Sequence, residues 1–244
     1  MGLAPDILPM GITGLLVRFS DTLSPEANRA ALAFRGGLEA EALPGVEEVS
    51  SALASTFLRL DPLAADIALL RSRVADLLAS QDWSEADLPP GRTLWRIPCA
   101  WGGAHGPDLA EVAAQAGLSE TAAIDELSTA RVRVLALGFA PGQPYLGALP
   151  SRWDIPRRSE LNPRIPGGAL GLAVRQFVLF AKTSPTGWSH VGQTAFRPFA
   201  PQSDTPIPLS PSDEVELVGV DAARIESLIA SDDPLGGATS EVIA

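Results

Sequence analysis

The stretch Leu135-Ala-Leu-Gly-Phe-Ala-Pro-Gly-Gln-Pro-Tyr-Leu-Gly147 passes abruptly from an apolar run into a series of glycines and prolines. The prolines fix φ and lack a backbone donor, whereas the glycines permit backbone angles or close approaches that a side chain would prevent. An apolar strand followed by such a stiff loop is typical of a β-rich domain whose loops carry the functional groups. We expect this loop to present two aromatic candidates for substrate binding, Phe139 and Tyr145.

Similar motifs return downstream, each beside a strand-like apolar run: Pro156-Arg-Arg158, Asn162-Pro-Arg-Ile-Pro-Gly-Gly168, Gln176 and Ser184-Pro-Thr-Gly-Trp188. Between and around these motifs the apolar runs have the length of short strands. We expect such strands at 131–137, 169–174, 177–181, 190–196 and 214–220. This spacing predicts a closed or nearly closed β-barrel.

The first 80 or so residues follow a different order, which is strand, helix, strand, helix. An apolar alternation at 12–19 precedes a helix from about 25 to 35, and strand material follows at 45–60. Asp61-Pro62 is expected to cap the second helix, whose apolar face comprises Leu63, Ile67, Leu70, Val74 and Leu77. The order predicts a small α/β sandwich with its helices on one face, and Thr93 to Pro98 as its closing strand.

The fold class that follows is α+β. We expect a small α/β sandwich at 1–91, a β-barrel domain with short helices at its start at 92–230, and a flexible C-terminal tail at 231–244. The acidic, proline-bearing segment 82–92 suits the linker between the two domains. Asp108 and Ser119 are the expected N-caps of the two short helices.

Composition excludes several classes of protein. The formal net charge of -11 at pH 7 argues against nucleic acid as a partner, because binding a phosphate backbone relies on clustered Lys and Arg. The single Cys99 excludes an intrachain disulfide framework and is expected in the core; two histidines provide no zinc-site spacing. No apolar stretch approaches the ~20 residues that cross a bilayer, and no leader is visible, so we expect a cytoplasmic protein without a membrane partner.

The segment from Ile97 to about Pro198, with the motifs quoted above, resembles the family of the B subunit of bacterial ATP-dependent 5-oxoprolinase, also called the KipI or allophanate hydrolase subunit 1 family. The resemblance implies an α/β N-terminal domain followed by a cyclophilin-like barrel. It also implies partners similar to the C and A subunits of that enzyme, a small cyclic amide as substrate, and ATP with Mg²⁺ at the level of the complex. No metal site is expected in this chain.

Three guanidinium groups lie close together in an otherwise acidic chain, at Arg157, Arg158 and Arg164. Arginine holds a carboxylate or phosphate through two parallel hydrogen bonds. These residues are therefore candidates for binding an anionic ligand at the mouth of the barrel. The alternative is exposure to solvent or pairing with Glu160 and Asp154.

Three further candidates come from the downstream motifs. Gln176 offers donors and an acceptor, which suit recognition of an amide or a lactam ring; hydrogen bonding to water at an outward strand position is the alternative. Ser184-Pro-Thr-Gly-Trp188 resembles the family's Ser-Pro-Gly-Gly-Trp element, which implies that Trp188 lies against the site, with packing as the alternative. Ser184 has no local base, so it is a binding candidate and not a nucleophile, and no catalytic residue is assigned.

Gly102-Gly-Ala-His-Gly-Pro-Asp108 looks like the family's Gly-Gly-Glu-Phe-Gly-Pro-Asp motif. Its backbone amides near a helix start could bind an anion, but a helix entry capped by Asp108 explains the pattern without a ligand and is favoured. His190, at the start of a predicted strand, is interpreted as a surface or packing residue.

Several positions depart from the family pattern. Ala104 and His105 replace Glu-Phe, Gln143 replaces Phe, Gly167 replaces Ala, Leu127 and Val132 stand for His and Tyr, and Gln193 replaces Arg. The changes remove a carboxylate, an imidazole, a phenol and a guanidinium, so they predict an altered substrate, a lower activity or a changed partner interface.

The leading hypothesis is a subunit of an ATP-dependent amidohydrolase that opens 5-oxo-L-proline to L-glutamate, in a site shared with partner subunits. The family relation supplies this reaction. Two alternatives follow from the same resemblance. One is a KipI-like regulatory protein that inhibits a histidine kinase, and the other is a component of a biotin-dependent urea or amide carboxyltransferase, which would need a carrier in trans.

Overall fold

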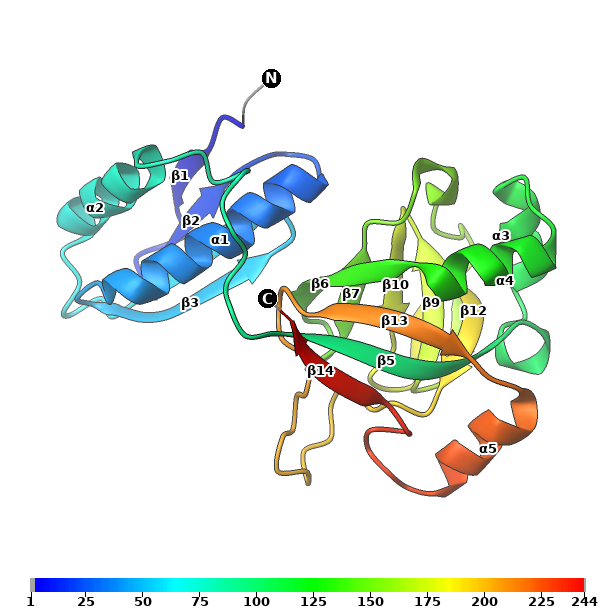
Figure 1. Ribbon diagram of the computed structural model, residues 1–244. Helices are drawn as coiled ribbons and strands as arrows, with labels where there is room; N and C mark the ends of the chain where they lie inside the picture. The colour runs from blue at the N-terminus through cyan, green and yellow to red at the C-terminus, as the bar shows by residue number, and fades with distance from the viewer. Residues whose placement is uncertain (1–2, 244) are drawn as a thin grey trace. The chain divides into compact units, whose positions relative to one another are not determined.

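The computed structural model describes residues 3–243 (Figure 1). The chain forms two compact units, and the boundary between them in the sequence lies between Pro90 and Gly91. This division lies one residue from the predicted boundary. The structure is mixed α and β, as predicted, with a small α/β unit followed by a closed barrel.

The first unit is a four-stranded antiparallel sheet with strand order β1-β2-β4-β3 and two helices. Its elements are β1 (Asp6–Pro9), β2 (Gly14–Arg18), α1 (Pro25–Glu41), β3 (Val46–Ala52), β4 (Ser55–Leu60) and α2 (Ile67–Ala79). Helix α1 begins where Ser24 Oγ accepts a hydrogen bond from the Ala27 backbone N–H at 3.1 Å, and it runs six residues beyond the predicted end. Phe34 and Leu38 on its buried side pack against Leu58 of the sheet.

The start of the second helix differs from the prediction. Asp61 forms a turn, because its side chain accepts the Leu63 N–H at 2.9 Å, and the helix begins only at Ile67, after the N-cap Asp66. Leu63 is 97% exposed and lies outside the apolar face. The buried side of α2 is therefore narrower than predicted and is centred on Leu70 and Val74.

The prediction that Thr93 to Pro98 closes the first sheet is wrong. This segment lies in β5 (Arg92–Trp101), which belongs to the barrel and pairs with three other strands. The apolar alternation of the segment is compatible with either sheet. Its pairing with strands near the end of the chain cannot be read from local sequence.

The second unit is a seven-stranded closed barrel with order β12-β9-β10-β7-β6-β13-β5, where β5 pairs with β12 to close the circle. The pair β13 and β5 is parallel, and the other neighbours in the barrel are antiparallel. The remaining strands are β6 (Arg131–Leu137), β7 (Pro144–Gly147), β9 (Ala169–Ala173), β10 (Gln176–Leu179), β12 (Ser189–Thr194) and β13 (Glu214–Gly219).

Short elements connect and cover these strands. Strands β8 (Asn162–Ile165) and β11 (Ser184–Thr186) form a separate two-stranded sheet. The helical elements are η1 (Gly103–His105), α3 (Leu109–Gln115), α4 (Glu120–Thr129), η2 (Ser151–Trp153) and α5 (Ala222–Ala230). None of the helices formed by residues 3–243 has the length and apolar character needed to cross a membrane.

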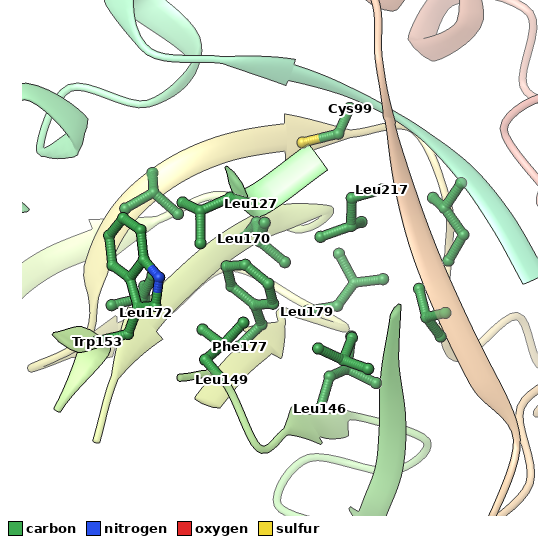
Figure 2. Packing of buried hydrophobic residues seen from close by; sticks show 14 of the residues in the cluster. Cys99, Leu127, Leu146, Leu149, Trp153, Leu170, Leu172, Phe177, Leu179 and Leu217 are labelled. Carbon is green, nitrogen blue, oxygen red and sulfur yellow. The ribbon is translucent and has the colours of Figure 1, made fainter. Parts of the chain in front are cut away.

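The barrel is filled by one apolar cluster (Figure 2). Phe177 and Leu170 from adjacent strands meet Leu217 from the far side of the barrel, and Leu127 enters from α4. Cys99 lies in the same cluster, and burial raises the pKa of its thiol. A buried, protonated thiol fits the predicted core role of Cys99.

The prediction of a flexible tail at 231–244 is wrong for residues 239–243. Residues Thr239–Ile243 form β14, which pairs antiparallel with the first half of β5, outside the closed circle of seven strands (Figure 1). Glu241 of β14 also pairs with Arg96 of β5 at 2.8 Å. Thr, Val and Ile favour a strand at this position, and the unpaired edge of β5 supplies the partner that the local sequence does not reveal.

Candidate functional site

A pocket of about 490 Å³ lies beside strands β9 and β12 of the barrel unit. Glycines before β9, the η1 turn and the end of α5 contribute to its walls. Its lining is mainly small or apolar, and the polar residues in it are His105, His190, Gln193, Thr194, Arg197 and Asp233. Apolar walls with a few polar groups are typical of a small-molecule site.

A β-bulge in β12 brings two of these polar residues together. His190 pairs with Gly171 of β9, and Gln193 pairs with Ala169, so Val191 is an extra residue in the register. Side chains directly opposite in a sheet share a face, and residues two apart on β9 also share a face. The bulge therefore places His190 and Gln193 on one face, although their spacing would put them on opposite faces of a regular strand.

This face is the outside of the barrel. Leu170 and Leu172 of β9 point into the barrel core, whereas Ala169 lies in a separate apolar cluster with Trp188 and Phe180. Since the side chains of β9 alternate, His190 and Gln193 lie with Ala169 on the outer face. The candidate site is thus on the outer wall of the barrel and not at its mouth, where the sequence predicted an anionic ligand.

His190 is buried and has an unused hydrogen-bonding atom. The residue is 6% exposed, and its Nε2 has no hydrogen-bond partner among the residues that the structure describes. Burial lowers the pKa of the imidazole, against the opposing charge of Asp108 and backbone hydrogen bonds with Gly192 and His105. A neutral imidazole that lines a pocket and has an unpaired nitrogen can bind a polar group of a ligand or accept a proton.

The lowered pKa of His190 predicts a loss of stability in acid. Between the ordinary histidine value of 6.5 and the lower folded value, the unfolded chain binds more protons than the folded chain. The free energy of unfolding should therefore fall as the pH drops below about 6.5. Urea denaturation at pH 7.5, 6.5 and 5.5 measures this slope, and His190→Gln should reduce it. Equal slopes for the wild type and the variant would contradict the prediction.

The side chain of Gln193 is held in one orientation by two hydrogen bonds that its amide nitrogen donates. Its Nε2 donates hydrogen bonds to the carbonyl oxygens of Gly167 at 3.0 Å and Thr194 at 2.8 Å. Both amide protons are used in this way, so Oε1 is the atom of this side chain available to accept a donor from a ligand. The residue that the sequence identifies as a replacement for an arginine therefore supplies a fixed neutral acceptor in place of a cation.

The loop from Gly102 to Asp108 is bound tightly to the bulged part of β12. The Gly102 N–H donates to the Val191 carbonyl at 3.2 Å, and the Asp108 N–H donates to the His190 carbonyl at 3.0 Å. The Asp108 carboxylate accepts the His190 N–H at 2.7 Å. This carboxylate makes no capping hydrogen bond to α3, so the predicted capping role of Asp108 is wrong.

Gly106 is the point of closest approach between this loop and β12. A Cβ atom added there would lie 2.1 Å from the Val191 carbonyl oxygen, so Gly106→Ala must displace either the loop or the bulge. We expect the variant to lose about 1–3 kcal/mol of unfolding free energy. Gly138→Ala is the matched control, because nothing lies within 4 Å of the added atom. Urea unfolding compares the two, and equal stabilities would contradict the close packing.

Charged residues occur at the edge of the pocket. Arg197 forms an ion pair with Asp232, and His105 Nε2 lies 3.6 Å from a carboxylate oxygen of Glu226. Their side chains are partly exposed. Arg197 is thus a cation of the lining that is already paired with Asp232, and Asp233 adds a carboxylate, while the buried polar residues His190 and Gln193 supply an imidazole and an amide.

Part of the set predicted from sequence forms a cluster next to this pocket. The Trp188 ring packs edge to face with Tyr145, with centroids 6.1 Å apart, and the Arg157 guanidinium carbon lies 5.0 Å from the Trp188 ring centre. Tyr145 pairs with Val178, Val178 with Gly171, and Gly171 with His190, so they form one row on the outer face. The Trp188 cluster and the pocket are therefore neighbours on one wall.

The other predicted residues have different surroundings. Arg158 pairs with Asp108 and Glu111, and not with Glu160 and Asp154, the partners named as the alternative to anion binding. Arg164 is exposed on β8, Phe139 is 91% exposed, and Gln176 begins β10. The Ser184 hydroxyl donates to the Lys182 carbonyl. None of the eight predicted residues lines the pocket, and their role in binding stays a prediction.

Sequence reasoning missed His190, Gln193 and Asp108 as members of a site. A histidine and a glutamine three positions apart on a strand are normally separated by the sheet, and only the bulge unites them. The glycine-rich motif before Asp108 was an available indication, because its spacing allows close backbone approach.

The chain matches known proteins over most of its length. Residues 5–209 match the family model of the carboxyltransferase domain, subdomain C and D. The B subunit of 5-oxoprolinase from Bacillus subtilis is 30% identical over 221 residues, which cover 86% of this chain and 91% of that protein. The B subunit of 5-oxoprolinase from Escherichia coli is 42% identical over 137 residues, which cover 56% of this chain and 63% of that protein.

Solved structures share the fold. The crystal structure of TTHA0988 matches with a TM-score of 0.70 and 31% identity over 86% of this chain, but the match covers only 40% of that longer chain. Kluyveromyces lactis urea carboxylase matches with a TM-score of 0.71 over 98% of this chain and 24% of its own. At 18% identity this second likeness concerns the fold alone.

Proposed function

The chain belongs to the family of carboxyltransferase subdomains C and D and of the 5-oxoprolinase B subunits, and we propose on this premise that it is one component of a 5-oxoprolinase-type amidohydrolase. The proposed reaction opens a cyclic amide, 5-oxo-L-proline, to L-glutamate. The relatives that carry the name of this enzyme support the reaction class. The partners proposed are chains similar to the C and A subunits of the same enzyme.

The observation that supports a site is His190, a buried residue that lines the pocket and whose Nε2 lacks a hydrogen-bond partner among residues 3–243. Opening a lactam requires water to add to the carbonyl carbon, the ring C–N bond to break and the nitrogen to gain a proton. A neutral imidazole can take the proton from water and return it to the leaving nitrogen. His190 is the proposed group for this transfer.

The neighbouring residues have proposed roles in holding the ring. Gln193 Oε1 accepts a hydrogen bond from the lactam N–H, and apolar residues such as Leu228 contact the ring carbons. Arg197 of the lining pairs with the substrate carboxylate. The adjacent Trp188 and Tyr145, predicted from sequence as substrate-binding residues, form the wall next to the pocket.

ATP with Mg²⁺ remains a proposal for the complex as a whole. Within residues 3–243 no three His, Cys, Asp or Glu side chains are grouped so that they could hold a metal ion. We assign no step involving ATP to the residues of this chain. The nucleotide would supply an activated amide oxygen, and its binding groups are proposed to lie in a partner.

The test is a reconstitution. The chain is co-expressed with candidate partner chains similar to the C and A subunits of 5-oxoprolinase, each chain is omitted in turn, and ATP hydrolysis and glutamate formation from 5-oxo-L-proline are measured. Activity that requires this chain supports the proposal. An assembled complex without such activity overturns it, and capture of a histidine kinase or biotin-dependent carboxyl transfer by the same complex would support one of the two alternatives.

A further inference from the structure

Asp108 occupies the position of a strand partner for His190. Strand β12 pairs with β5 only at residues 192–194, so at His190 the neighbouring position is filled by the loop before α3. The backbone N–H of His190 donates to Asp108 Oδ2, and its carbonyl oxygen accepts from the Asp108 N–H. Two hydrogen bonds to a single residue thus fix the backbone from which the imidazole extends.

The carboxylate of Asp108 accepts the His190 N–H instead of capping α3. A side-chain cap stabilises a helix by about 1 kcal/mol, and α3 begins at Leu109 without one from Asp108. The Asp108 side chain is 18% exposed, and its Oδ1 accepts a hydrogen bond from the Arg158 guanidinium at 2.9 Å. Each of its two oxygens therefore has a separate partner, one on β12 and one on Arg158.

Arg158 is itself fixed by the segment that carries it. Its backbone N–H donates to the Gly187 carbonyl at 2.7 Å, and the preceding Arg157 lies over the Trp188 ring. The guanidinium also approaches Glu111 at 3.5 Å. Residues 156–161 are exposed apart from these contacts, so no apolar packing explains why Arg158 turns toward Asp108.

We propose that Arg158 is a positioning residue for His190 and acts through the carboxylate of Asp108. The ion pair holds Asp108 against the bulge of β12, and Asp108 holds the backbone that aims the imidazole at the pocket. The kinetic part of this inference rests on the proposed function, whereas its structural part does not.

The proposal has a direct readout because the chain has two histidines, which can be assigned in NMR spectra with His105→Gln and His190→Gln. Arg158→Gln removes a cation that offsets the charge of Asp108, so we expect the pKa of His190 to rise by roughly half a unit. Asp108→Asn removes the anion and should lower it. The charged and titratable groups near the imidazole, directly or through Asp108 and His105, are Asp108, His105, Arg158, Glu111, Glu226, Arg197 and Asp233.

Two control variants accompany this titration. Arg158→Lys keeps the charge and one donor, so it should restore the wild-type value. Arg73→Gln removes an exposed arginine of the first unit and should cause no shift. The proposal is overturned if Arg158→Gln gives the same His190 titration as Arg73→Gln, or if Asp108→Asn and Arg158→Gln shift it in the same direction.

Kinetics of the assembled complex separate this inference from the proposed function. We expect Arg158→Gln to lower kcat about tenfold, with KM changed less than about twofold, and Arg158→Lys to recover most of the loss. A wild-type complex inactive on 5-oxo-L-proline would refute the proposed function while the titration still decided the positioning role. An active complex in which Arg158→Gln has normal kcat and normal His190 titration would refute the positioning role alone.

Discussion

His190→Ala should lower the rate of glutamate formation by the assembled complex by about 10²- to 10⁴-fold, the usual contribution of a positioned acid or base. The reason is that His190 lines the pocket and its buried Nε2 has no hydrogen-bond partner among residues 3–243. The measurement is steady-state kinetics with 5-oxo-L-proline and ATP, together with circular dichroism to establish that the variant is folded.

Two further variants sharpen this prediction. His190→Gln can form a hydrogen bond but cannot transfer a proton at neutral pH, so it should stay as slow as His190→Ala if the imidazole is an acid or base. Gln176→Ala tests the best polar candidate from sequence. A larger loss for Gln176→Ala than for His190→Ala would place the substrate away from the pocket and contradict our assignment.

Phe177→Ala should produce the largest loss of stability, about 3–5 kcal/mol, because it removes a fully buried ring from the centre of the barrel (Figure 2). The centroid of this ring lies 6.2 Å from that of Trp101, and the ring is part of the main cluster of the barrel. The cavity that its removal leaves cannot close unless several strands move. The melting temperature of the barrel unit should fall by roughly 10 °C in a thermal scan.

The matched control for this change is Phe139→Ala, which removes the same atoms from a side chain that is 91% exposed. Its effect on unfolding free energy should stay within about 0.5 kcal/mol. If the two variants melted at the same temperature, the core described for the barrel would be wrong.

Much of the architecture could be predicted from local patterns. The strands after residue 131 and their glycine- and proline-rich turns predict a barrel, because alternating apolar residues must be buried against one another. The family resemblance implied the two-domain order, and the comparisons confirm the family. The positions of β5 and β14 were misjudged, since strand pairing over more than 100 residues has no local pattern.

The site was less predictable than the fold for a similar physical reason. Trp188, Tyr145 and Arg157 come from distinctive motifs and do lie together. His190 and Gln193 meet only because one extra residue changes the register of β12, and Asp108 joins them from a loop more than 80 residues earlier. A regular two-residue period cannot predict such an arrangement.

The pairing of β5 with strands near the end of the chain affects how the protein is made. Arg96 of β5 reaches Glu216 of β13 across 120 positions, so the barrel cannot close before β13 has left the ribosome. Until then, β5 exposes an apolar edge on which misfolded chains can pair, and chaperone binding during synthesis should concentrate on this interval. The first unit has no such dependence, so it can fold while the barrel is still being translated.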